Sequence, residues 1–287
     1  MKNIILVIKG FVMGIANIIP GVSGGTLALT LGIYEKFINA ISHFFKNFKE
    51  NLKFLIPIFI GIILSILTMS NVISYSFNHY ALGTTLLFMG LVLGGIPMLL
   101  GKVKGTKEVK SFFSYIIFII TFAFVMILAF SEEIFGAGLS SVTLNISMSG
   151  LLMMFIVGVI AASTMIIPGV SGSLVLMLLG YYTPVIEAIK EFTHFDNFTV
   201  NLFNLGFFGV GVLVGIVLVA KLIEMLFKKY ETKTYFGVLG FIIASIIAIP
   251  VSVIHEYGFF TFDILSIIIG IVLFILGSFI GFKLGEK

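Results

Sequence analysis

The chain has 287 residues, of which 59% are hydrophobic and only 10% are charged, and its mean hydropathy is +1.22. A soluble domain carries about a quarter charged residues, so this composition excludes a soluble globular enzyme and a disordered chain and indicates an integral membrane protein. The formal net charge is +4, but the lysines stand in short clusters between apolar runs, which membrane orientation explains better than nucleic-acid binding.

The first predicted element is a re-entrant helical hairpin over residues 10–45. The uncharged stretch that follows Lys9 is broken by the sequence PGVSGG at Pro20–Gly25. The limbs beside the break, Gly10–Ile19 and Thr26–Tyr34, each have about half of the roughly 20 residues that a membrane crossing requires. Irregular backbone at this depth is tolerated only where it is buried in protein or lines a cavity. We therefore expect the hairpin to enter and leave on the same side.

Three membrane-spanning helices are predicted after this hairpin. They are Phe54–Phe77, Thr84–Leu100 and Phe112–Phe130. Their apolar residues do not alternate with polar ones as in a membrane barrel, and backbone groups in lipid must be satisfied within the segment, so each run is predicted to be helical. Residues 1–130 form one predicted unit.

A second unit, residues 146–287, is predicted to repeat this plan. A second hairpin over 147–190 is broken at Pro168–Gly172, although its longer first limb leaves a full crossing open. The segment Ile18–Gly24 recurs unchanged as Ile166–Gly172, an offset of 148 residues. Three crossings follow again, and because three is odd, the second copy is expected to be inverted, as in many secondary transporters. The three runs are Leu202–Phe227, Tyr235–Ile254 and Ile264–Leu284.

Lysine placement predicts that both termini are cytoplasmic, because this topology brings the lysine clusters to one side. The lysines expected to face the cytoplasm are Lys2, Lys9, Lys46, Lys49, Lys53, Lys102, Lys104, Lys107, Lys110, Lys228, Lys229, Lys233, Lys283 and Lys287. Pairs of glycines at positions 90/94, 211/215 and 277/281 have the spacing of close helix contacts, and packing is their expected role.

The two breaks have the chemistry of an anion site. Proline ends the limb before it, Ser23 and Ser171 are natural N-caps, and the first N–H groups of the outgoing limbs have no partner inside the helix. With the positive end of the helix dipole, such N–H groups bind phosphate or carboxylate; alternatively, each break is only a packing kink. The predicted substrate-binding residues are Gly21, Ser23, Gly24, Gly25, Thr26, Gly169, Ser171, Gly172 and Ser173.

Few other polar groups lie near the breaks. Three candidates for lining a cavity, Asn17, Ser163 and Thr164, could equally bond to backbone carbonyls. Glu35 and Glu187 are candidates for coupling transport to a cation, although both are close enough to a membrane edge to reach water. Lys221 and Glu224 are spaced to pair on one helix. The chain has no Cys and its four His show no metal-ligand spacing, so neither a metal nor another cofactor is expected.

At these two motifs the chain resembles the bacterial polyprenyl-phosphate transporter family, the undecaprenyl phosphate translocases. The resemblance rests on Ile19–Thr26 and Ile167–Ser173 and covers nearly the whole chain. It implies a plasma-membrane protein that returns undecaprenyl phosphate from the outer to the inner leaflet for cell-wall synthesis. Gly25 and Thr26 become Ser173 and Leu174 in the second copy, so the two halves of the site are expected to bind phosphate unequally.

Two other functions compete with lipid transport. Integral-membrane undecaprenyl diphosphate phosphatases also use inverted repeats and a Pro-Gly-x-Ser loop, but their loop carries an Arg where this chain has Gly24 and Gly172. All 17 basic residues here are lysines, and phosphoryl transfer needs cationic stabilisation of developing charge, so an enzyme is not expected. The third possibility is an ion-coupled carrier of a small soluble anion. The partners expected for the leading hypothesis are the lipid bilayer, a polyprenyl phosphate and a coupling cation, H⁺ or Na⁺.

Overall fold

The computed structural model describes residues 2–17, 23–106, 111–130, 142–170, 172–193 and 196–285. Within these ranges the regular structure is entirely helical, as predicted, and no strand occurs. The helices are α1 (Lys2–Ala16), α2 (Gly24–Thr30), α3 (Tyr34–Ser42), α4 (Phe48–Gly94), α5 (Ile96–Gly105), α6 (Phe112–Ala129), α8 (Met148–Ile166), α9 (Gly172–Leu178), α10 (Tyr182–Thr193), α11 (Phe198–Lys229), α12 (Glu231–Tyr257) and α13 (Ile264–Gly285).

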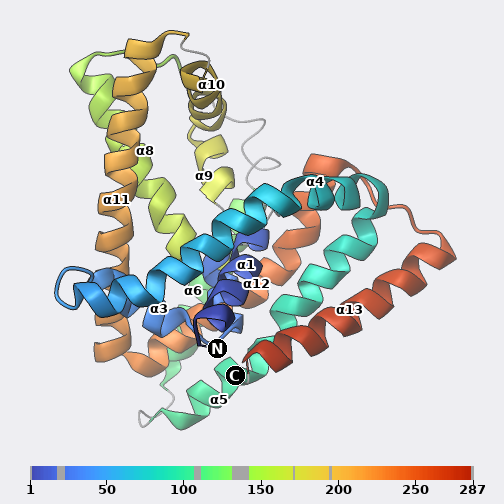
Figure 1. Ribbon diagram of the computed structural model, residues 1–287. Helices are drawn as coiled ribbons and strands as arrows, with labels where there is room; N and C mark the ends of the chain where they lie inside the picture. The colour runs from blue at the N-terminus through green and yellow to red at the C-terminus, as the bar shows by residue number, and fades with distance from the viewer. Residues whose placement is uncertain are drawn as a thin grey trace.

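Among the described residues, five helical stretches are long and apolar enough to cross a membrane. The first, Phe48–Gly105, contains both of the first two predicted spans, because α4 continues through Tyr80, where non-helical angles (φ −137°, ψ 44°) kink it. The other four stretches coincide with α6, α11, most of α12 and α13. Figure 1 shows α4 crossing the molecule and then turning sharply to run beside α13.

Each predicted hairpin is built from a long helix, a break, a short helix and a third helix. The limb predicted over Thr26–Tyr34 is shorter than expected: α2 has seven residues, and the chain turns at Gly32 (φ +68°) into α3. The second region turns in the same way at Gly180 (φ +74°) between α9 and α10. A positive φ is readily accessible to glycine and costly for most other residues, so these two positions fix equivalent bends.

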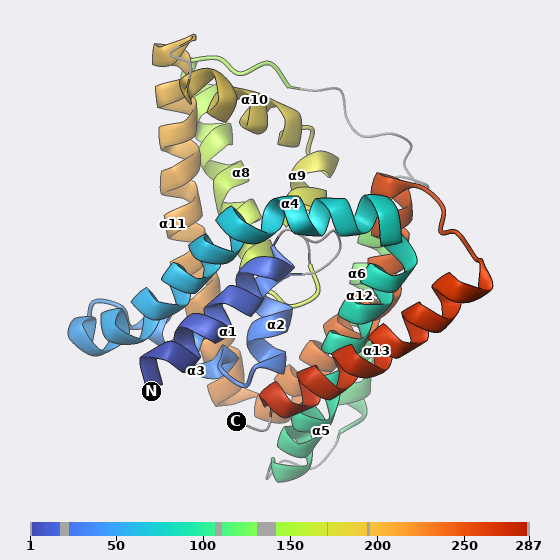
Figure 2. The ribbon, with the colours of Figure 1, turned by 45° about the vertical axis from the view of Figure 1, so that its right-hand side comes forward.

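Glycines bring the helices of the two units together at equivalent places. In α1, Gly10 lies against the carbonyl of Ile58 in α4, and Gly158 of α8 lies against the carbonyl of Phe208 in α11. At both positions a Cβ would overlap backbone atoms. Small residues allow such close backbone approach in membrane helices. The matching contacts show that α1 packs on α4 much as α8 packs on α11, and Figures 1 and 2 show α8 and α11 side by side.

The last helices of each unit pack against helices of the other unit. Gly90 in the second half of α4 contacts the carbonyl of Phe274 in α13, whereas Gly240 in α12 contacts the carbonyl of Phe118 in α6. The predicted packing role of the paired glycines is confirmed, since positions 90, 94, 211, 215, 277 and 281 all meet backbone of a neighbouring helix. Helices of the first unit, α4 and α6, therefore pack against helices of the second unit, α13 and α12.

The two described ends of the chain lie at the same end of the molecule as α5 (Figures 1 and 2). Lys9, one of the lysines expected to face the cytoplasm, is buried: its side chain is only 6% exposed, and its Nζ donates a 2.6 Å hydrogen bond to the carbonyl of Leu31, the C-cap of α2. A helix C-terminus leaves carbonyls without internal partners and favours a nearby cation. The C-terminal end of α2 therefore holds this lysine inside the protein.

Candidate functional site

The two sequence breaks meet in the interior of the protein. The backbone N–H of Gly169, in the second break, donates hydrogen bonds to Ser23 Oγ (3.2 Å) and Thr26 Oγ1 (2.7 Å) of the first. All three residues are buried. A buried N–H that lacked these acceptors would carry a free-energy cost of about 1–3 kcal/mol. The first break therefore supplies the hydroxyls and the second supplies the donor.

Ser23 is the N-cap of α2, as its position after the break predicts. Its Oγ accepts a hydrogen bond from the backbone N–H of Thr26 at 3.2 Å. Its extended backbone (φ −109°, ψ 149°) is typical of an N-cap. The N–H groups of Gly24 and Gly25 have no hydrogen-bond partner among the described residues. Both residues line the larger cavity described below.

A large cavity reaches the first break. Its volume is about 1750 Å³, and Asn17, Gly24 and Gly25 line its inner end. Its walls are mostly apolar and come from α1, α3, α4, α8 and α11. Along α11 the lining runs from Leu213 to Lys229, about 24 Å at 1.5 Å per residue. The cavity thus connects the break with the end of α11.

The outer end of this cavity is basic, whereas the described residues that line its inner end carry no charge. The outer end is lined by Lys46, Lys221, Lys228, Lys229 and His43, and Glu224 is the one carboxylate among the described lining residues. The basic residues attract anions toward an apolar channel whose lining includes Gly24 and Gly25. This combination fits an amphipathic molecule with a negatively charged head.

A smaller cavity of about 750 Å³ reaches the second break on the other face of α11. Ser163, Ile167 and Pro168 line its inner end, and Lys233 and Tyr230 line its outer end. The helix α11 separates the two cavities, since Val214 and Val217 face the first and Val219 and Leu222 face the second. Each break therefore has its own cavity.

The structure brings some of the predicted site residues together and separates others. Ser23, Thr26 and Gly169 lie in one hydrogen-bonded group. Gly24, Gly25 and Asn17 face the larger cavity. Gly172 begins α9. The backbone of Ser173 lies in α9, whereas its side chain, Gly21 and Ser171 lie outside the described residues.

The remaining candidates are spread out. Ser163 lines the smaller cavity although its hydroxyl donates to the Val159 carbonyl. Thr164 lines neither cavity, because it is buried and its hydroxyl donates to the Ala161 carbonyl. Glu35 accepts hydrogen bonds from Lys102 (3.0 Å) and from the Tyr235 hydroxyl. Glu187 is exposed on α10, away from both cavities.

The predicted pairing of Lys221 with Glu224 is wrong. The Glu224 carboxylate instead pairs with Lys228, four residues further along α11, and accepts hydrogen bonds from Asn39 and Ser42 of α3. Positions three and four apart are both neighbours on a helix, but a glutamate that precedes its lysine by four residues is in the favoured order, and Glu224 and Lys228 have this order. The sequence showed the charges on α11 but could not show that α3 would lie against them.

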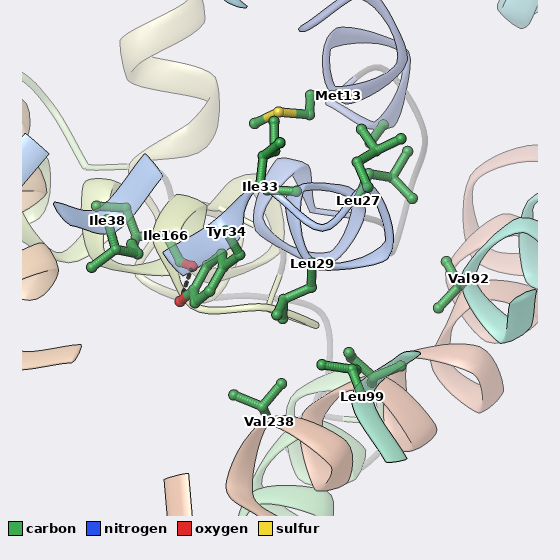
Figure 3. Packing of buried hydrophobic residues seen from close by; sticks show 14 of the residues in the cluster. Met13, Leu27, Leu29, Ile33, Tyr34, Ile38, Val92, Leu99, Ile166 and Val238 are labelled. Atoms are coloured by element: carbon green, nitrogen blue, oxygen red, sulfur yellow. Dashed lines mark hydrogen bonds between the residues drawn. The ribbon is translucent and has the colours of Figure 1, made fainter. Parts of the chain in front are cut away.

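Two contributions to the site were missed from the sequence. The Tyr34 hydroxyl donates a 3.1 Å hydrogen bond to the Ile166 carbonyl beside the second break, and Figure 3 shows the ring reaching that carbonyl. The sequence places Tyr34 only at the end of the predicted limb Thr26–Tyr34. Lys46 and Lys229 line the larger cavity, whereas their sequence clusters predicted only membrane orientation. In both cases the missing information is a contact between distant segments.

Comparison with known proteins identifies the family. Residues 13–257 match the family model described as undecaprenyl phosphate translocase-like. The chain belongs to this family. It is 34% identical over 285 residues to the polyprenyl-phosphate transporter of Staphylococcus aureus, covering 98% of this chain and 95% of that protein. It is 28% identical over 254 residues to the polyprenyl-phosphate transporter of Vibrio cholerae, covering 83% of this chain and 75% of that protein. No solved structure matches the chain.

Membership of the undecaprenyl phosphate translocase-like family confirms the resemblance found in the paired motifs. The family and both relatives are described as transporters, so the prediction that this chain is not an enzyme is also confirmed. Together with five apolar helices of membrane-crossing length, the match identifies a multi-pass membrane protein. The cavity and the meeting of the breaks are the features through which such a transporter can act.

Proposed function

We propose that the chain flips undecaprenyl phosphate across the bacterial plasma membrane by alternating access, returning the carrier lipid for cell-wall synthesis. The observation that carries this proposal is the larger cavity, which has a basic outer end, apolar walls and an inner end formed by Asn17, Gly24 and Gly25. The phosphate binds at the paired breaks, and the polyprenyl tail stays in the apolar channel or in lipid. The names of both relatives support this substrate.

The paired breaks bind phosphate through backbone N–H groups rather than through a guanidinium. Gly24 and Gly25 supply N–H groups beside the cavity, and Gly169 supplies a third that now bonds to Ser23 and Thr26. A headgroup arriving from the cavity competes with these hydroxyls for the Gly169 N–H. On the second copy's side, Gly172, Ser171 and Ser173 complete the proposed site together with Gly21 of the first break. We expect the first break to contribute most of the affinity.

Alternating access follows from the proposed topology of two inverted copies. In this proposal residues 1–130 and 146–287 are the copies, each a re-entrant hairpin followed by three crossings, and both termini are cytoplasmic. The equivalent glycine contacts of α1 with α4 and of α8 with α11 support the duplication. Broken helices that meet between inverted copies near the midplane are a common transporter architecture. The basic end of the cavity then faces the cytoplasm.

A cation drives the return of the lipid in this proposal, because a phosphate is costly at the bilayer centre. The candidates are H⁺ and Na⁺, with Glu35 and Glu187 as coupling residues. Glu35 already has Lys102 and Tyr235 as partners, so its carboxylate links α3, α5 and α12. Proteoliposomes given either a proton or a sodium gradient distinguish the two cations. In Glu35→Gln, transport that still responds to both gradients argues against a coupling role for this residue.

The central test uses proteoliposomes that contain undecaprenyl phosphate in both leaflets. A phosphatase added outside hydrolyses only the outer lipid if the chain does not transport, and nearly all of it if the chain does. We expect Ser23→Ala and Gly24→Leu to abolish the extra hydrolysis while both variants still insert. A leucine at position 24 begins within 3.0 Å of the Asn17 amide and fills the inner end of the cavity. Normal transport by either variant contradicts the proposed site.

The matched control is Ser245→Ala. Ser245 is equally buried, but its hydroxyl donates within its own helix to the Ile242 carbonyl. This variant should transport normally. Vesicles loaded with inorganic phosphate test the soluble-anion alternative, and release of that phosphate at the rate of lipid movement would favour a small-anion carrier. Phosphate release from undecaprenyl diphosphate by the purified protein would favour the enzyme.

A further inference from the structure

A group of four donors surrounds one carboxylate at the outer end of the larger cavity. Glu224 accepts hydrogen bonds from Asn39 Nδ2 at 3.3 Å, Ser42 Oγ at 2.5 Å and Lys228 Nζ at 2.5 Å. His43 Nδ1 lies 3.3 Å from the same carboxylate. The carboxylate side chain is only 12% exposed, whereas that of Lys228 is 68% exposed. The protein therefore holds an anion here, and that anion is its own glutamate.

This donor set matches the chemistry of a phosphate monoester. A hydroxyl, an amide, an imidazole and an ammonium can all donate to phosphate oxygens, and donors that carry charge form the stronger bonds. Ser42, His43 and Lys228 line the cavity that reaches the first break, so a headgroup in that cavity can reach them. Lys46, Lys221 and Lys229 line the same outer end and add further positive charge.

The donors are confined to one end of the molecule. By the offset of 148 residues, Asn39, Ser42 and His43 correspond to Glu187, Lys190 and Glu191 in the second copy. Two of these three counterparts are acidic and cannot donate to a phosphate when ionised. If these hydrogen bonds served only to hold helices together in each copy, the same donors would be expected in the second copy. The cluster is instead specific to the lysine-rich end of the transport path.

We propose that Asn39, Ser42, His43 and Lys228 form a second binding site for the phosphate monoester, and that Glu224 occupies this site in place of the headgroup. The proposal rests on the proposed function, because it needs a lipid phosphate in the larger cavity. A headgroup leaving the breaks displaces Glu224 from the donors. The returning carboxylate then expels the headgroup. Glu224 thus weakens binding and speeds release.

The test uses the full chain in lipid nanodiscs and farnesyl phosphate as the probe. Glu224→Gln keeps the shape of the side chain and removes its charge. An internal competitor such as the Glu224 carboxylate lowers the apparent affinity according to the fraction of sites that it blocks. Its removal in Glu224→Gln should therefore lower the dissociation constant of farnesyl phosphate on the order of tenfold. In the proteoliposome assay KM and turnover should both fall, since release becomes slow. A purely structural ion pair predicts unchanged or weaker binding.

One further variant keeps the proposal testable if Glu224→Gln does not fold. Lys228→Met removes an exposed donor and should raise the dissociation constant of farnesyl phosphate several-fold. Its control is Lys104→Met, which removes an exposed lysine that lines neither cavity. The control for Glu224→Gln is Glu231→Gln, an exposed carboxylate outside both cavity linings. Neither control should change binding.

The outcomes separate this site from the proposed function. The second site alone is overturned if the wild type transports and binds but Glu224→Gln and Lys228→Met cannot be distinguished from their controls. A wild type that neither binds farnesyl phosphate nor moves undecaprenyl phosphate overturns the proposed function and this site with it. If Glu224→Gln tightens inorganic phosphate as much as farnesyl phosphate, the assignment to a lipid headgroup is wrong. Selective tightening of the lipid phosphate supports it.

Discussion

The two breaks share a backbone plan but differ in chemistry. Each lies between an apolar helix and a seven-residue helix, and each short helix ends in a turn with a positive-φ glycine. The first break has the hydroxyls of Ser23 and Thr26, whereas the second presents the N–H of Gly169 to them. The buried Lys9 of α1 also corresponds to a buried valine, Val157, in α8. The two regions thus share the glycine turns, whereas the hydroxyls that accept the bond between the breaks belong to the first break.

The largest expected effect tests whether the shared plan holds in both copies. Gly10→Leu and Gly158→Leu each place a side chain where a carbonyl of the facing helix now lies. Overpacking a close contact typically costs 1–3 kcal/mol, and here the obstacle is backbone, so we expect each variant to lose about 3 kcal/mol. Thermal unfolding in detergent, followed by circular dichroism because the chain has no Trp, measures the loss.

Gly209→Leu is the control for this pair, since no atom lies within 4 Å of a Cβ at that position. It should unfold at the wild-type temperature. If Gly10→Leu is destabilised and Gly158→Leu is not, the two copies do not pack equivalently. The shared plan would then be limited to the motif itself.

A smaller effect tests the difference between the breaks. Thr26→Val keeps the shape of the side chain but removes the oxygen that accepts the 2.7 Å hydrogen bond from Gly169. The Gly169 N–H keeps its longer hydrogen bond to Ser23 Oγ, at 3.2 Å. We therefore expect a loss of about 1.5 kcal/mol in unfolding free energy. Transport should slow as well, because the two breaks lose their closest contact. Both are measured in the assays described above.

Thr30→Val is the matched control, because Thr30 is just as buried but donates only to the Thr26 carbonyl within α2. It should retain transport. Equal transport by Thr26→Val and Thr30→Val would show that the bond between the breaks serves stability alone. The comparison therefore separates the contact between breaks from the internal structure of α2.

The sequence was informative wherever the signal is local or repeated. Apolar runs located the long helices, and proline and glycine located the break before Gly24. The duplicated motif suggested that the two breaks belong together, but the direction of the bond from Gly169 to Thr26 requires their relative orientation. The contacts of Lys9 and Glu224 also depend on segments 22 and 182 or more residues away. Periodicity along one helix carries no information on such partners.

The smallest expected effect compares two tyrosines at the same position of the repeat. Tyr34 is 2% exposed and donates to the Ile166 carbonyl, whereas Tyr182 is only partly buried. Tyr34→Phe leaves that buried carbonyl without the hydroxyl and should cost about 1 kcal/mol. Tyr182→Phe should cost no more than a few tenths, as is usual for a substitution that leaves no buried group unpaired. Thermal unfolding of the two single variants measures the difference. Equal losses would mean that the hydroxyl of Tyr34 adds nothing to the contact between the first hairpin and the second break, and that the ring alone maintains it.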